Sequence, residues 1–154
     1  MQKLRTILFT GNEIPKPLTI EHEDYRDLAK AIGCDTIDVV SVKVNGIDYD
    51  LVVNDNGLYE SETVTAIWGG ENHAVYQTIK GPCIVLKSNE DGDFESLSFV
   101  DALNIIDNVA CYKDVHGNEG YALLYNMGIV PPTREEFMAR MKEILGADAA
   151  VVEA

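Results

Sequence analysis

The clearest pattern along the chain is a pair of alternating apolar and polar runs separated by Asn45-Gly46. Asn-Gly between two β-rich runs is the strongest short signal for a hairpin, because both turn residues need a positive φ. A two-residue turn fixes the register, so we expect residues 37–44 to pair with residues 47–53. One face of this hairpin is apolar and should meet the core: Val40, Val42, Val44, Ile47, Tyr49, Leu51 and Val53. The other face is polar and should meet water: Ser41, Lys43, Asp48 and Asp50.

Three segments follow the helical period instead. Apolar side chains recur on one face between residues 22 and 32, which predicts a first helix. A second helix is expected over residues 98–109, because Ser98 and Asp101 resemble a capping box at its start. Apolar positions nearly encircle this second helix, so we expect it to be largely buried. A capping box and an apolar stripe predict a third helix over residues 133–145.

The other segments complete the expected fold. Strands are predicted over residues 3–9, 75–79 and 83–87, and a short helix over residues 62–68, ended by Gly69-Gly70. The sequence therefore predicts one compact α+β domain over residues 1–146, followed by a weakly ordered tail over residues 147–154. Its sheet should be mainly antiparallel and built on a central β-hairpin, Ile37–Val53, with about three helices packed on it: 22–32, 98–109 and 133–145.

The charge balance changes the list of possible functions. The 154 residues include 12 basic and 26 acidic side chains, a net charge of −14. This excludes a diffuse basic footprint for nucleic acid, and also anchoring to an anionic membrane through a polybasic patch. No run approaches the roughly 18 apolar residues that span a bilayer. No signal peptide is recognisable either, so we expect a cytoplasmic protein.

Motifs for metals, phosphates and nucleophilic catalysis are missing from the sequence. The turns at residues 54–57 and 89–92 lack the ligand spacing of a calcium loop. There is no glycine-rich phosphate loop, and the three scattered cysteines form no C-x-x-C pair. We therefore expect no metal and no cofactor, and we favour a protein that is not an enzyme.

Six residues are candidates for ligand binding. Asp38 falls on the apolar hairpin face, where it could accept hydrogen bonds from a ligand's amine or hydroxyl groups, or pair with a basic side chain of the fold. The loop that begins at Trp68 combines backbone donors, an aromatic ring and an imidazole, and could hold a base or a phosphate. The same segment could equally be a surface loop with no role in binding. Lys80 is one of few cations available to an anionic ligand. The candidates are Asp38, Trp68, Gly69, Gly70, His73 and Lys80.

The stretch from Cys34 to about Leu103 resembles a known family. The matching pieces lie in the hairpin, the turn after it, the strand after Gly81 and the serine-leucine-serine entry into a helix: residues 37–40, 51–58, 79–86 and 94–98. They resemble a small domain family of unknown function found in accessory proteins of bacteriophages and conjugative elements. The family has no established catalytic residues to carry over. The resemblance implies a mobile-element protein that acts on processes of its bacterial host.

These observations favour a phage-type accessory protein that binds and sequesters a small ligand in the bacterial cytoplasm. The ligand would be nucleotide-like, such as an immune signal of host anti-phage defence, and a homo-oligomer could build the pocket between copies. The alternative is an acidic decoy that imitates the phosphates of DNA and inhibits a host restriction or DNA-processing protein. A third hypothesis is an enzyme that degrades a nucleotide signal. None of the three needs direct nucleic-acid or membrane binding.

Overall fold

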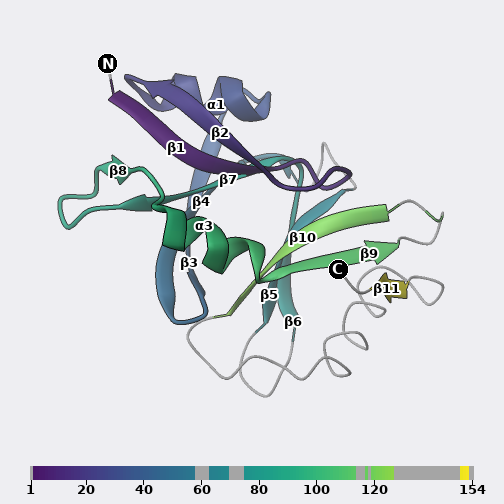
Figure 1. Cartoon of the computed structure of the whole chain (residues 1–154). Helices are drawn as coiled ribbons and strands as arrows, with labels where there is room; N and C mark the ends of the chain where they lie inside the picture. The colour runs from purple at the N-terminus through teal and green to yellow at the C-terminus, as the bar shows by residue number, and fades with distance from the viewer. Residues whose placement is uncertain are drawn as a thin grey trace.

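Strands dominate the computed structural model (Figure 1). It describes residues 2–57, 63–69, 75–113, 117, 119–126 and 150–152. The strands are β1 Gln2–Phe9, β2 Lys16–His22, β3 Ile37–Val44, β4 Ile47–Asn54, β5 Val64–Gly69, β6 Val75–Lys80, β7 Cys83–Ser88, β8 Phe94–Glu95, β9 Val109–Lys113, β10 Glu119–Asn126 and β11 Ala150–Val152. The helices with described bounds are α1 Tyr25–Ile32 and α3 Phe99–Ile106. Neither of them is long and apolar enough to cross a membrane.

The sheet is mostly antiparallel, as the sequence predicts. Its main path runs in the order β11-β9-β10-β3-β4-β7-β1-β2. Strand β5 joins β10 in parallel and carries β6 on its other side, while β8 pairs with the end of β7. Strands and helices together make an α+β fold. The predicted helix over residues 133–145 lies outside the described residues.

The β3–β4 hairpin forms with the register expected from its turn. Val44 pairs with Ile47, Val42 with Tyr49, and Asp38 with Val53. The turn residues have the required positive φ, 51° at Asn45 and 81° at Gly46. The prediction of the pairing is therefore confirmed.

Both faces of this hairpin carry a core. The predicted apolar face packs under α3, in a cluster that includes Val42, Tyr49 and Ile105. The opposite face packs against α1 and β2, in a second cluster that includes Val52 and Leu28. The expectation that this second face meets water is wrong at Asp50, which is only 8% exposed. On the same face, Val52 packs with side chains of α1 and β2, so part of this face is covered. Figure 1 shows α1 beside β1 and β2, and α3 in front of β3 and β4.

Two helix predictions are corrected by the structure. The short helix expected over residues 62–68 is wrong for residues 64–68, which belong to β5 between β6 and β10. Ala66 and Ile67 are 0% and 1% exposed, so both sides of this segment are buried, as in an interior strand. The second correction concerns α3, which is not largely buried. Its buried side chains include Asp101 and Ile105, whereas four apolar ones are exposed: Phe99, Val100, Leu103 and Ile106.

Candidate functional site

The structure describes the backbone of four of the six predicted site residues, Asp38, Trp68, Gly69 and Lys80, and it does not bring them all together. Asp38 is exposed near the open end of the hairpin, where its carboxylate accepts a hydrogen bond from the Val39 N–H at 2.9 Å. Trp68 and Gly69 end β5, and Gly69 pairs with Asn126, which pairs in turn with Lys43 near the hairpin turn. Five residues of β3, about 16 Å, therefore separate Asp38 from the Trp68 end.

Lys80 lies at the other end of β5 from Trp68, since it pairs with Val64. Gly70, His73 and the side chain of Trp68 lie outside the described residues. The structure thus keeps Trp68 and Gly69 together and sets Asp38 and Lys80 apart from them. The binding role of these residues stays a prediction.

A different set of residues surrounds a cavity of about 460 Å³ beside the hairpin turn, which we name the hairpin cavity. Side chains alternate between the faces of a strand, so its polar members on β3 and β4 lie on the face opposite α3. Ser88 follows them on the neighbouring strand β7. The lining residues are Ser41, Val42, Lys43, Asp48, Tyr49, Asp50 and Ser88.

Asp50 is the most unusual group in the hairpin cavity. It is 8% exposed, and its hydrogen bond from the Ser41 hydroxyl is 3.5 Å long, at the limit of such contacts. The nearby Lys43 ammonium instead lies 3.8 Å from Asp48, whose side chain is 84% exposed. A carboxylate withdrawn from water normally accepts several short hydrogen bonds. The cavity therefore offers acceptor capacity that the described side chains leave largely unused.

Sequence reasoning missed Asp50 because it assigned the whole polar face of the hairpin to water. A signal was present in the same strands. Val52 on β4 shares that face with Asp50, and an apolar side chain there indicates cover by another element. Read in this way, the pattern would have placed Asp50 at the border between covered and open sheet.

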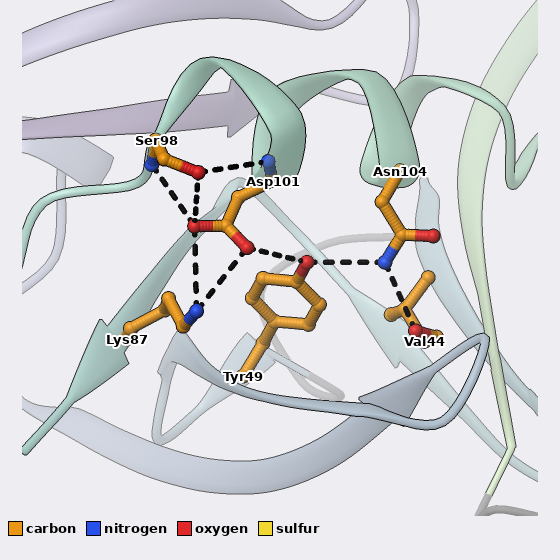
Figure 2. Close-up of polar contacts among 6 residues, drawn as sticks. All are labelled: Val44, Tyr49, Lys87, Ser98, Asp101 and Asn104. Atoms are coloured by element: carbon orange, nitrogen blue, oxygen red, sulfur yellow. Dashed lines mark hydrogen bonds and ion pairs between the residues drawn. The ribbon is translucent and has the colours of Figure 1, made fainter.

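On the other face of the same strands, polar side chains form a dense network under α3 (Figure 2). The Tyr49 hydroxyl donates to Asp101 Oδ1 at 3.0 Å, and Lys87 Nζ lies 3.2 Å from the same oxygen. Asn104 Nδ2 donates to the Tyr49 hydroxyl and to the Val44 carbonyl, both at 3.0 Å. These contacts connect α3 to β3, β4 and β7. We name this set, completed by Ser98, the α3 network.

The predicted capping box at the start of α3 is confirmed and is part of the α3 network. The Ser98 backbone N–H and hydroxyl donate to Asp101 Oδ2 at 2.9 and 2.8 Å, and the Asp101 N–H donates to the Ser98 hydroxyl at 3.1 Å. Burial alone raises the pKa of Asp101, but hydrogen bonds from Ser98, Tyr49 and Lys87 outweigh it and leave the pKa below its usual value. Asp101 is therefore held as a charged acceptor.

Tyr49 is the neutral member at the centre of the network. Burial is the main cause that raises its pKa to about 12, and the neighbouring carboxylate of Asp101 acts in the same direction, while the hydrogen bond from Asn104 opposes it. The Lys87 ammonium also lies 5.7 Å from the centre of the Tyr49 ring. These polar groups hydrogen-bond to one another within the network. We therefore infer that the network holds α3 in position on the sheet.

Metal and thiol chemistry find no support in the described part of the chain. No group of three or more His, Cys, Asp or Glu side chains that could hold a metal ion occurs there. No disulfide joins Cys34, Cys83 and Cys111. Burial raises the pKa of the Cys83 thiol to about 12, and burial, with Glu119, raises that of Cys111. Raised thiol pKa values disfavour the reactive thiolate.

Comparison with known proteins identifies a family for this architecture. A family model described as a domain of unknown function, DUF3846, matches residues 4–116. No curated protein and no solved structure matches the chain. The family match extends beyond residues 34–103 in both directions and contains the hairpin cavity and the α3 network. It covers more than half of the 154 residues, and the chain therefore belongs to the DUF3846 family.

Proposed function

We propose that this chain binds and holds a small polar ligand in the hairpin cavity and does not turn it over. One observation carries the proposal: the nearly buried Asp50 lines the cavity, and from the described part of the chain its carboxylate receives a single hydrogen bond, 3.5 Å long, from Ser41. A ligand amine or hydroxyl group would supply the donors that this carboxylate lacks. The volume of about 460 Å³ falls within the usual range of small-molecule sites, about 300–1,000 Å³.

The charges of the cavity define the class of ligand. Two carboxylates, Asp48 and Asp50, face one ammonium, Lys43. This balance favours a ligand rich in hydroxyl and amine donors over a polyanion. A nucleotide meets the requirement when its ribose hydroxyls and base amine approach Asp50 and a single phosphate lies toward Lys43.

The contacts favour capture over catalysis. A hydroxyl nucleophile is activated by a base at about 2.6–3.2 Å, and the Ser41–Asp50 contact is longer, at 3.5 Å. Lys43 lies near Asp48 and has no hydrogen bond to Ser41 among the described contacts. The resemblance to phage and conjugative-element proteins supplies the biological setting. We propose that the ligand is a nucleotide immune signal, sequestered in the cytoplasm of the bacterial host.

The first test is native mass spectrometry of the protein purified from bacteria with active anti-phage signalling, followed by denaturing extraction. The expected result is a bound small molecule that is released intact, and its mass identifies it. A chemically altered product would indicate an enzyme. An empty protein that co-purifies with a host protein only at low salt would instead support the acidic decoy, and both outcomes contradict capture.

A matched pair of substitutions tests the position of the site. Asp50→Asn keeps the shape of the side chain and removes its charge, so we expect the affinity for the extracted molecule to fall at least about tenfold. Asp38→Asn makes the same change at an exposed position of the same hairpin, and should leave the affinity within about twofold. Titration calorimetry measures both. If Asp38→Asn weakened binding and Asp50→Asn did not, the site would lie at Asp38, as predicted from the sequence, and not at the hairpin cavity.

A further inference from the structure

Strand β3 has a neighbouring strand along only part of one edge in the described part of the chain. On one side it pairs with β4 over its whole length, Ile37–Val44. On the other side β10 pairs with it at a single position, Asn126 opposite Lys43. No described strand pairs with residues 37–42 on that side, and we name this stretch the β3 edge.

The register of the hairpin determines which backbone groups point outward at the β3 edge. Val44 and Ile47 flank the two-residue turn and form a hydrogen-bonded pair. Along an antiparallel ladder, such pairs alternate with pairs whose N–H and C=O groups point away from each other. The Asp55 N–H donates to the Thr36 carbonyl at 3.1 Å, as this alternation requires. The residues of the β3 edge with outward groups are therefore Ile37, Val39 and Ser41.

The β3 edge is open to solvent. Val39 is 41% exposed, and Asp38 and Ser41 are exposed too. A strand edge with free N–H and C=O groups is a template for pairing with another extended chain. In this mode of recognition, backbone hydrogen bonds provide affinity and alternate side chains provide specificity. The backbone of the β3 edge therefore selects a partner in the extended conformation.

Asp38 selects the charge of such a partner. Its Oδ1 accepts a hydrogen bond from the outward Val39 N–H at 2.9 Å, and so takes the place of a partner strand's carbonyl oxygen. An added strand must displace this charged acceptor. A lysine or arginine side chain next to Asp38 offsets the loss, because it pairs with the released carboxylate. A neutral or acidic strand has no such compensation.

The surroundings of Asp38 also favour a cationic partner. Asp35 and Asp55 are exposed at the same end of the hairpin, and no ion pair joins any of these three carboxylates to a described residue. Neighbouring elements supply fewer cations, Lys30 in the last turn of α1 and Lys80 at the end of β6. The net charge of −14 adds long-range attraction for a basic chain.

We propose that the β3 edge binds an extended, basic segment of another protein, which joins the sheet as an antiparallel strand. Both strands that pair with β3, β4 and β10, are antiparallel to it. In this arrangement, partner residues opposite Ile37, Val39 and Ser41 exchange backbone hydrogen bonds with β3, and the side chains between them lie on the face of Asp38. The preferred segment therefore alternates apolar or small residues with lysine or arginine. Such binding requires no ligand in the hairpin cavity.

A synthetic peptide of about ten residues, in which lysine alternates with valine, tests the proposal. Fluorescence anisotropy with the full chain in about 0.15 M salt should give a dissociation constant on the order of 100 µM. N-methylation of the valine amides removes the donors that face β3 and should weaken binding at least about tenfold. N-methylation of the lysine amides, which face away, keeps the charge and should change the affinity less than about threefold. No binding, or equal effects of the two methylations, would overturn the proposal.

Variants of the chain locate the binding position. Val39→Pro removes the outward N–H and leaves the pairing with β4 intact, so it should weaken peptide binding at least about tenfold, whereas Val39→Thr keeps that N–H and should change it less than about threefold. Asp38→Asn should reduce the preference for the lysine peptide over a glutamine analogue at least about threefold. Asp107→Asn makes the same change in net charge at an exposed position and should reduce this preference less than about 1.5-fold. Equal effects within either pair would contradict a site at the β3 edge.

Hydrogen exchange at the Ser41 amide shows whether the β3 edge is free before the peptide binds. In the chain alone this outward N–H should exchange rapidly, and saturation with the lysine peptide should slow its exchange at least about tenfold. Slow exchange in the chain alone would mean that another part of the same chain, or a second copy, already covers the β3 edge. That result would overturn the proposal, as would rapid exchange that the bound peptide does not change.

Discussion

A nearly buried carboxylate lies against each face of the hairpin strands, and the two carboxylates differ in the number of hydrogen bonds that they accept. Under α3, Asp101 is 6% exposed and accepts hydrogen bonds from Ser98, Tyr49 and Lys87. On the other face, Asp50 is 8% exposed and receives one 3.5 Å hydrogen bond from Ser41. The two groups are equally withdrawn from water and differ almost entirely in their partners.

This contrast separates a group that holds the fold from one that is available to a ligand. A buried charge with a full set of donors strengthens the elements that supply them, here α3 and the sheet. A buried charge with one weak donor costs stability, and such a cost is typical of binding sites, where the ligand completes the hydrogen bonds. Substitutions that remove each carboxylate should therefore have different consequences.

Removal of Asp101 should have the largest effect. Asp101→Ala takes the acceptor away from Ser98, Tyr49 and Lys87 at once and leaves their donors buried or poorly paired. We expect the free energy of unfolding in urea to fall by about 3 kcal/mol. Asp107→Ala, at an exposed position at the end of the same helix, should change it by less than about 0.5 kcal/mol. A loss below about 1 kcal/mol at Asp101 would mean that the network does not hold α3.

Alkaline pH should weaken the same network through Tyr49. Burial raises the pKa of Tyr49 in the folded chain to about 12, above the unfolded value near 10. The folded state therefore favours the protonated phenol, and its contribution to stability is complete below pH 10 and is lost between about pH 10 and 12. Chemical denaturation across this range should show the decline. In Tyr49→Phe the decline should be smaller.

Some alkaline loss should persist in Tyr49→Phe. Burial also raises the pKa of Tyr125, which lies in the same core cluster, so its ionisation destabilises the fold in both proteins. The difference between the two pH profiles isolates Tyr49. Identical profiles would show that Tyr49 does not titrate as a buried group.

The local features of the fold are the ones that the sequence predicts well. The Asn45-Gly46 turn determines the hairpin register, and the Ser98–Asp101 capping box marks the start of α3. Each depends on residues close together in the chain, whose geometry follows from backbone rules. The predictions that fail depend on distant segments. β5 is a strand because it pairs with β10, almost 60 residues later.

The candidate site was harder to predict for the same reason. Asp50 is 8% exposed on a sheet face that also packs against α1 and β2 at Val52, and the sequence of the hairpin does not indicate which elements cover that face. The exposure of Leu103 is a similar case, because the apolar pattern of α3 predicts burial but not which surface supplies it. The pattern of apolar residues indicates which side chains tend to be buried. Which element of the fold covers each of them depends on tertiary packing.

Substitution of Asp50 should have the smallest effect on the unliganded protein, with the opposite sign. Asp50→Asn removes the carboxylate of a residue that is only 8% exposed and keeps an oxygen for the Ser41 hydroxyl, so the free energy of unfolding should stay the same or rise by up to about 1 kcal/mol. Urea unfolding of the ligand-free chain measures the change. A loss above about 1 kcal/mol would mean that Asp50 is held by firm partners, as Asp101 is, and would remove the basis for a site at the hairpin cavity. A gain in stability together with weaker ligand binding would show that the chain keeps this carboxylate for its ligand at the expense of its own fold.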